Sequence, residues 1–355
     1  MRWLRTLPLV ALGLLVSSGA FAMFRAADLV VVPVAAATPG LNGSNWRTDV
    51  DIMNVDTTAI DVEIVLLQCC GLDNSAWFLN IANHLGGRKD EGFGHVDTKL
   101  AGIAPGASVR INDIIGTDFN LANTKGTLLI FAYQAGTLMT TNPRGGVPKL
   151  IVVNSRSYSV GTDASGNQMT YGQEIPGLPW YDYIDVGKKA RGLDHAVFQG
   201  LEEDARYRTA IGVVNVSDPQ TSLDVALTLN ASDGTQIGNT QYVSLSPLAM
   251  DQYDQAIINL FGKSLSDAIS GATLTVKMDA YISGAAVPVP ALMVYCSRID
   301  NNTNDPVYLE QSFTKELPWD CVFNGNCTSV ASALGLSRSP AAAPGHLRPP
   351  TSLSH

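Results

Sequence analysis

The chain has 355 residues, of which 46% are hydrophobic and only 15% are charged, and its formal net charge is −9. Soluble domains carry about 25% charged residues, and nucleic-acid-binding surfaces need a basic face, so this composition argues against nucleic-acid binding. The apolar content argues against disorder. Many Gly, Thr, Ser and Asn residues and few long helical patterns favour an all-β protein, and the length suffices for two domains.

The N-terminal residues have the features of a signal peptide. Arg2 and Arg5 are basic, residues 7–16 are apolar, and Ala20-Phe21-Ala22 has the pattern of a cleavage site. The apolar run is shorter than the roughly 20 residues of a membrane-spanning helix, although an uncleaved N-terminal anchor is the alternative. We expect residues 1–22 to be removed and the product to be secreted, to the periplasm or the extracellular space, with no membrane span.

One stretch of the chain occurs twice, which predicts two related units. Residues 208–216 repeat the pattern of residues 47–55: Arg, Thr, Asn and Val recur at equal spacing, and each copy follows an aromatic residue, Trp46 or Tyr207. Four further pairs of segments match in the same order: 60–67 with 223–229, 105–115 with 247–257, 126–131 with 271–276, and 150–156 with 292–298. The last match places Arg156 on Arg298.

Each unit contains about seven short strand candidates separated by turn residues, which is typical of an immunoglobulin-like antiparallel β-sandwich. We therefore predict an all-β protein of two such sandwiches in tandem. The expected boundaries are a signal peptide at 1–22, unit 1 at 23–178 with an insertion near 69–98, a linker at 179–193, unit 2 at 194–316, and a disulfide loop with a flexible tail at 317–355. A short strand near 240–244 is expected to replace the insertion in unit 2.

Three local features give further expectations. Pro33 predicts an edge or entry position for the first strand, because proline lacks the backbone donor that a central strand needs. Asp254 is a candidate cap for a short helix that ends before Gly262. Side chains alternate along a strand, so Val213 should face the core of unit 2, and a polar substitution at Gly212 on the opposite face should be milder.

The five cysteines point to an oxidising compartment. Cys321 and Cys327 flank a short loop and are the expected disulfide. Cys69 and Cys70 are adjacent, which restricts the geometry of any bond that they form. Cys296 lies in an apolar strand and is expected to be a buried free thiol, and no Cys or His spacing resembles a zinc site.

The repeat resembles a known family. The aromatic-Arg-Thr start, the Asn-Val end, residues 297–308 (SRIDNNTNDPVY) and residues 171–176 (YGQEIP) are similar to a tandem immunoglobulin-like repeat of secreted bacterial proteins. The resemblance implies an exported β-sandwich and carries over no catalytic residues. The insertion and the cysteine-bearing end depart from the usual repeat.

Oxygen-rich residues near the end of unit 2 form a candidate calcium site, since calcium prefers six to eight oxygen ligands. The alternative is a turn in which these side chains bond their own backbone. The candidate residues are Asp300, Asn301, Asn302, Asn304 and Asp305. No other cofactor is indicated.

Aromatic residues in the connections are candidates for binding a glycan or a protein partner, because exposed rings stack on sugars and anchor interfaces. They are Trp77 and Phe78 in the insertion, and Trp180, Tyr181 and Tyr183 in the linker. The alternative is that they pack over the sandwich ends or between the units.

Arginines recur in both units and therefore indicate a structural role, such as a charge-assisted bond that closes one edge of each sandwich. Arg47 and Arg208 start equivalent strands, and Arg156 and Arg298 are expected to end equivalent strands.

The sequence shows no nucleophile elbow, phosphate-binding glycine loop or zinc-protease helix. A glycosidase pair of carboxylates remains open, because its members can be distant in sequence. We therefore expect a secreted, non-catalytic surface, adhesion or assembly protein. The alternatives are a carbohydrate-binding protein that uses the connection aromatics and, third, a secreted hydrolase.

Overall fold

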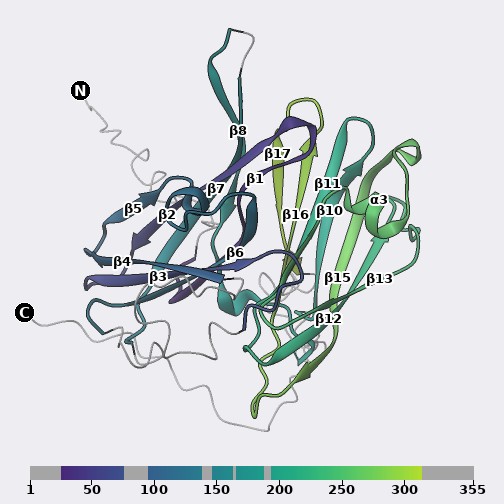
Figure 1. Ribbon diagram of the computed structural model, residues 1–355. Coiled ribbons are helices and arrows are strands. Elements are labelled where there is room, and N and C mark those ends of the chain that lie inside the picture. The colour runs from purple at the N-terminus through teal and green to yellow at the C-terminus, as the bar shows by residue number, and fades with distance from the viewer. Residues whose placement is uncertain (1–24, 76–94, 138–145, 163–164, 188–192, 314–355) are drawn as a thin grey trace, which may run out of the picture.

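The computed structural model describes residues 25–75, 95–137, 146–162, 165–187 and 193–313. Within these ranges the protein consists of antiparallel strands with two short α-helices, so the predicted all-β class is confirmed. Two β-bodies lie side by side, unit 1 in purple and blue and unit 2 in green and yellow (Figure 1). Residues 1–22, predicted to be a signal peptide, lie outside the described residues, as do Trp77, Phe78, Cys321 and Cys327.

Unit 1 has two layers joined through its first strand. One layer has the order β4-β3-β6-β1 and the other β5-β2-β7-β8; the last residues of β1 pair with β2, and β9 pairs with the start of β1. The elements are β1 (Leu29–Pro39), β2 (Asn45–Asn54), β3 (Ile60–Gln68), β4 (His95–Ile103), β5 (Ser108–Ile111), α2 (Ile114–Thr117), β6 (Thr124–Gln134), β7 (Ile151–Thr162), β8 (Gln168–Pro176) and β9 (Leu178–Pro179).

Unit 2 repeats this arrangement strand for strand. Its sheets have the orders β13-β12-β15-β10-β18 and β14-β11-β16-β17. The elements are β10 (His195–Glu203), β11 (Tyr207–Asn215), β12 (Thr221–Asn230), β13 (Gln241–Leu245), β14 (Met250–Tyr253), α3 (Ala256–Phe261), β15 (Ile269–Ser283), β16 (Leu292–Asp300), β17 (Pro306–Glu310) and β18 (Ser312–Phe313). The strand β4 is the counterpart of β13, so the last residues of the predicted insertion (95–98) belong to a regular strand of the repeat.

The strand order differs from the immunoglobulin arrangement. In that arrangement the first strand lies in the same sheet as the second strand, and the seventh strand lies in the same sheet as the sixth. Here β10, the first strand of unit 2, pairs with the sixth, β15. The seventh strand, β16, pairs with the second, β11. The first and seventh strands have thus exchanged sheets, and unit 1 shows the same exchange.

The first strand is central rather than at an edge. β1 lies between β6 and β9, and its pairing with β6 shifts between Val32 and Ala35. Pro33 falls inside this irregularity, where the missing backbone donor costs nothing, and its carbonyl accepts a hydrogen bond from Thr127 Oγ1 (2.9 Å). The edge assignment of Pro33 was therefore wrong.

A buried asparagine closes the same corner in both units. Asn54 Nδ2 donates to the carbonyls of Thr58 and Ile103, both at 2.9 Å, and its Oδ1 accepts from a backbone N–H two residues later. Asn215 repeats this pattern with the carbonyls of Thr221 and Ser246. Every polar atom of the amide group is used, which accounts for the recurrence of asparagine at this place.

The equivalence of Arg156 and Arg298 was wrong by one residue. Asn54 faces Ile151 across the β2–β7 pair, and Asn215 faces Leu292 across β11–β16. Counting from these anchors, Ser297 holds the place of Arg156. Since side chains alternate, the one-residue offset puts the two arginines on opposite faces of their sheets.

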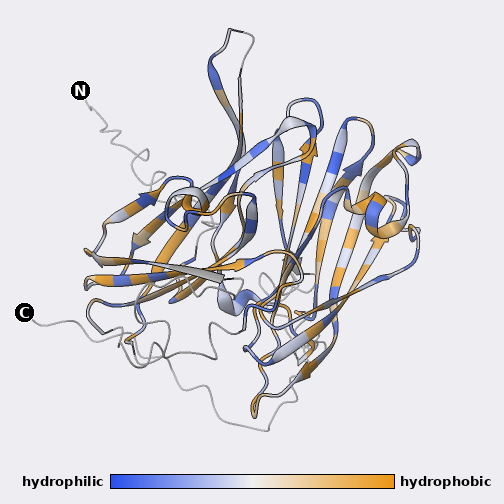
Figure 2. Ribbon diagram, viewed as in Figure 1, coloured by the Kyte–Doolittle hydropathy of each residue, from blue (hydrophilic) through white to orange (hydrophobic). Residues whose placement is uncertain are grey.

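The two units share an apolar interface. Val214 and Val216, with Met250, Met293 and Tyr295, belong to the core cluster of unit 1 although they are residues of unit 2. Buried residues line both faces of β11, whereas its counterpart β2 alternates between buried and partly exposed residues. Figure 2 shows apolar and polar residues following one another along many strands of both bodies.

Gly212 therefore faces the inter-unit interface rather than water. A Cβ atom built there would overlap the ring of Tyr295, which is 2% exposed. The expectation of a milder effect at Gly212 than at Val213 assumed that the outer face of β11 is solvated, and that assumption was wrong.

No helix within the described ranges is long and apolar enough to cross a membrane.

Candidate functional site

The segment that follows β3 connects the two units. The backbone of Cys69 forms an isolated parallel β-bridge with Met250 of β14, and the N–H of Gly71 donates to the Met250 carbonyl (3.3 Å). The buried side chain of Asn74 donates from Nδ2 to the carbonyl of Leu248 (2.9 Å). The first residues of the predicted insertion thus hold unit 1 against the edge of unit 2.

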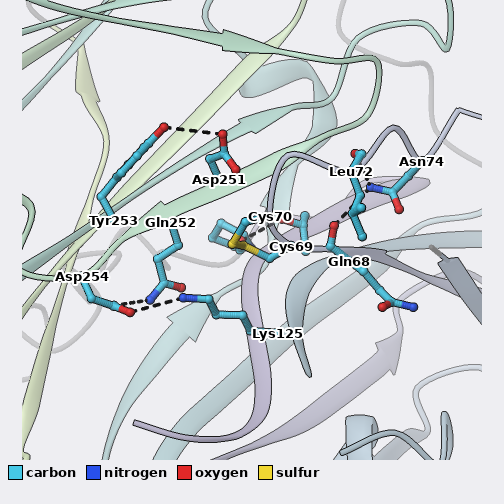
Figure 3. The surroundings of a disulfide bond; sticks show 12 residues. Gln68, Cys69, Cys70, Leu72, Asn74, Lys125, Asp251, Gln252, Tyr253 and Asp254 are labelled. Atoms are coloured by element: carbon cyan, nitrogen blue, oxygen red, sulfur yellow. Dashed lines mark hydrogen bonds and ion pairs between the residues drawn. A yellow bond between two sulfur atoms is a disulfide. The ribbon is translucent and has the colours of Figure 1, made fainter. Parts of the chain in front are cut away.

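Cys69 and Cys70 are bonded to each other, and we call this pair the vicinal disulfide. A carboxylate oxygen of Asp251 lies within 4.8 Å of both sulfurs, and burial raises the pKa of this carboxyl group (Figure 3). These three groups could hold a metal ion only after reduction, because the thiolate is the metal ligand. Cys296 is a buried free thiol, as predicted.

A cavity of about 300 Å³ lies beside the vicinal disulfide, between the two units. Unit 1 contributes polar or aromatic side chains from β2, β6, β7 and β8, namely Trp46, Lys125, Ser157 and Gln173. Unit 2 contributes the opposite wall, which consists of Arg208 from β11, Gln252 from β14, Asp254 just after β14, and Tyr295 and Ser297 from β16. Val34 and Ala36 of β1 supply apolar surface. We call this cavity the inter-unit cleft.

A chain of hydrogen bonds orders the polar groups of the cleft. Lys125 Nζ lies 3.3 Å from Asp254 Oδ2, and Gln252 Nε2 donates to Asp254 Oδ1 (2.7 Å), as Figure 3 shows. The hydroxyl of Tyr295 donates in turn to Gln252 Oε1 (2.8 Å). Because these side chains are held by one another, the cleft is largely preformed.

Asp254 does not cap α3, contrary to the sequence prediction. The N-cap is Gln255, and its side chain makes no capping bond. The backbone N–H groups of Ile257 and Ile258 donate instead to the buried carboxylate of Glu203 (2.9 and 3.2 Å). Asp254 is thereby left to pair with Lys125 in the cleft.

Arg208 closes the loop that was a candidate calcium site. The residue is 3% exposed, and its Nη1 and Nη2 donate to the amide oxygens of Asn301 (2.8 Å) and Asn304 (2.9 Å). Burial lowers the pKa of this guanidinium group, against the opposing effect of Asp254 and Asp300. The amide oxygens of Asn301 and Asn304, two of the groups considered for calcium, therefore already accept hydrogen bonds from the Arg208 guanidinium group.

The remaining oxygens of this loop follow the turn interpretation. Asp300 Oδ1 accepts hydrogen bonds from the backbone of Asn302 (2.8 Å) and Thr303 (3.1 Å). The residues Asn302 and Asp305 are exposed. This is the pattern of a side chain that stabilises its own turn.

A second hollow of about 460 Å³ adjoins the cleft, and Pro39 and Asn123 line both. It contains Arg47, whose Nε lies 3.1 Å from Asp113 Oδ2. Burial raises the pKa of Asp113, and the charge of Arg47 opposes this effect. The two repeat-equivalent arginines thus border adjacent hollows.

The other two arginines make structural contacts. Arg156 donates to Thr170 Oγ1 (3.1 Å) and lies over the ring of Tyr158. Arg298 donates to the carbonyl of Gly200 (3.3 Å) and lies 3.4 Å from Glu202.

The described linker aromatics lie at the junction of the units, outside the residues that line the cleft. Trp180 Nε1 donates to the Val216 carbonyl (2.9 Å), and its ring centroid lies 5.0 Å from that of Tyr183. Both rings pack against the shared apolar cluster, whereas Tyr181 is 52% exposed. Two aromatic residues line the cleft, Trp46 and Tyr295, and the sequence marked Trp46 only as the start of the repeat.

Comparison with models of known protein families gives no match, and comparison with curated proteins gives no significant match.

Proposed function

We propose that the chain is an exported, non-catalytic binding protein and that its ligand occupies the inter-unit cleft. The observation that carries this proposal is the preformed cavity of about 300 Å³, with polar side chains from both units and an apolar base. Cavities of this size, with a few fixed polar groups, are the usual sites of small ligands. Export rests on the basic, apolar and small-residue pattern of residues 1–22.

The groups around the cleft fit binding better than catalysis. Asp254 is the one carboxylate among the described lining residues, and it is held by Lys125 and Gln252. A glycosidase uses two carboxyl groups, and a serine nucleophile needs an adjacent base. The hydroxyls of Ser157 and Ser297 instead bond Thr48 Oγ1 (2.8 Å) and Gln173 Nε2 (2.9 Å).

A carbohydrate is the ligand class that the cleft favours, and Trp46 is the specific reason. Its indole is partly exposed and lines the cleft, and no described residue accepts a hydrogen bond from its Nε1. An indole offers a flat apolar face and one donor, which suits a sugar ring, and amides such as Gln68 and Gln173 supply partners for hydroxyls. The sugar site would then lie in the cleft rather than on the linker aromatics.

A glycan array followed by calorimetric titration of the exported protein tests this proposal. Trp46→Ala should weaken binding of the selected glycan by about 5- to 30-fold, since a lost aromatic contact of this kind costs roughly 1–2 kcal/mol. Tyr181→Ala is the matched control, because that ring is exposed and lies outside the cleft.

Three results would contradict the proposal. Unchanged affinity in both Trp46→Ala and Gln173→Ala would show that the ligand binds elsewhere. Chemical conversion of the bound glycan, followed by mass spectrometry, would contradict a non-catalytic role. Recovery of exported protein that still begins at Met1 would contradict removal of the leader.

A further inference from the structure

The repeat-equivalent arginines have different partners. In unit 1, Arg47 lies 3.1 Å from the carboxylate of Asp113, the left-handed residue (φ 46°) that precedes α2. In unit 2 the matching left-handed residue (φ 49°) before α3 is Gln255. The β2–β5 and β11–β14 pairs have the same register, so Gln255 holds the place of Asp113. Unit 2 has therefore replaced the carboxylate partner with a neutral amide.

Arg208 consequently keeps a buried charge without a carboxylate in contact. Its two hydrogen-bond partners, Asn301 and Asn304, are neutral, and no carboxylate of the described residues lies within 4.0 Å of its guanidinium nitrogens. Asp254 and Asp300 act on it only through space. Buried charges in proteins are ordinarily paired, because removing a charge from water is costly.

The balance of charge around the cleft is positive. Arg208 and Lys125 line it, and Asp254 is the one carboxylate among the described lining residues. This excess stands out on a chain with a formal net charge of −9. A ligand carboxylate would supply the partner that unit 1 provides from its own chain.

We propose that the ligand of the inter-unit cleft is an acidic oligosaccharide, and that Arg208 binds the carboxylate of a uronic acid residue. The inference rests on the proposed function and adds the chemical class of the ligand. A guanidinium group has five N–H donors, of which the two asparagines use two, so donors remain for a carboxylate. Lys125 adds positive charge from the opposite unit, and Trp46 supplies the face for the sugar ring.

The test is calorimetric titration of the full exported protein with matched trimers. Galacturonate, glucuronate, mannuronate and guluronate trimers are each compared with the neutral trimer of the same linkage. At least one acidic trimer should bind about tenfold or more tightly than its neutral counterpart, because a hydrogen bond to a charged group contributes about 1.5–3 kcal/mol.

Two variants and a control assign the preference to Arg208. Arg208→Gln should abolish the acidic preference, whereas Arg206→Gln, on an exposed arginine beside the same loop, should retain it. Arg208 also holds that loop, so circular dichroism must first show that the Arg208→Gln variant is folded. Gln255→Asp avoids this difficulty, because it installs the unit 1 partner at a left-handed position that aspartate tolerates well. This variant should fold normally, lose the acidic preference and bind neutral sugars as before.

The outcomes separate the inference from the proposed function. If acidic and neutral trimers bind equally and Trp46→Ala weakens both, the cleft binds sugar but the carboxylate inference is overturned. If no acidic trimer binds, the inference is likewise overturned. If Trp46→Ala leaves the affinity for acidic trimers unchanged and Gln255→Asp leaves their preference unchanged, the carboxylate binds elsewhere, and both proposals fail.

Discussion

Substitution of Gly212 by alanine tests whether β11 is buried on both faces. The added methyl group would lie 2.7 Å from Tyr295 Cδ1 and closer still to two further atoms of the ring, well inside the 3.5–4.0 Å of a favourable carbon contact. The ring has little freedom to move, because its hydroxyl bonds Gln252 (2.8 Å) and it stacks on Tyr308 at an interplanar angle of 18°. Overpacking of this kind costs about 1–3 kcal/mol.

Thermal unfolding followed by circular dichroism measures this cost. About 1–3 kcal/mol corresponds to a fall in Tm of roughly 2–12 °C for a cooperative unit of 150–250 residues. Gly161→Ala in β7 is the control, since a Cβ there has no neighbour within 4 Å. Combining Gly212→Ala with Tyr295→Leu should recover part of the loss, because the two changes act at one contact. If Gly212→Ala lowers the Tm no more than Gly161→Ala does, the buried outer face of β11 is refuted.

Three further predictions concern the corner amide, a buried carboxylate and the cysteines. Asn215→Ala should lower the free energy of unfolding by about 2–4 kcal/mol, because it leaves buried backbone groups without partners. Denaturant titration measures this loss, with Asn239→Ala at an exposed site as the control. Equal losses in the two variants would contradict the prediction. Burial raises the pKa of Glu203 above its ordinary value of 4.5, so the stability that its protonated form contributes at low pH should be lost as pH rises from 4.5 through the raised pKa. Glu203→Gln should remove this part of the decline in a pH series of unfolding midpoints. Peptide mapping without reductant should find the vicinal disulfide within one peptide. It should also find Cys321 linked to Cys327, and alkylation of both of these cysteines without reductant would disprove that pairing.

The sequence by itself determined the elements and their repetition. Side-chain alternation is a local property of a strand, so the apolar pattern of residues 60–67 and 223–229 was enough to place β3 and β12. The repeat of Arg, Thr, Asn and Val located β2 and β11, because this pattern too is contained within one stretch of the chain. The recurring asparagines proved to have the same three hydrogen bonds, and their recurrence was the visible signal.

The residues of the cleft were only partly predictable. Arg208 was noted for its recurrence, but its recurrence suggested a scaffold role in both units. The difference between Asp113 and Gln255 was visible in the aligned repeats, although its meaning depended on knowing that this position lies next to the arginine. Lys125 carried no local signal, and Gln173 was noted only as part of the motif at 171–176, because the two reach the cleft from strands far apart in the chain.

The tertiary structure alone decided how the strands pair and what covers them. Which sheet β1 or β16 joins depends on contacts between distant segments, and the same alternating strand satisfies either position. The continuous apolar run of β11 was compatible with burial on both faces, but only the packing of unit 1 against Met293 and Tyr295 supplied the second layer. The cleft exists because that packing leaves a cavity that Arg208, Lys125 and Trp46 all line, and no single stretch of the chain contains those three residues.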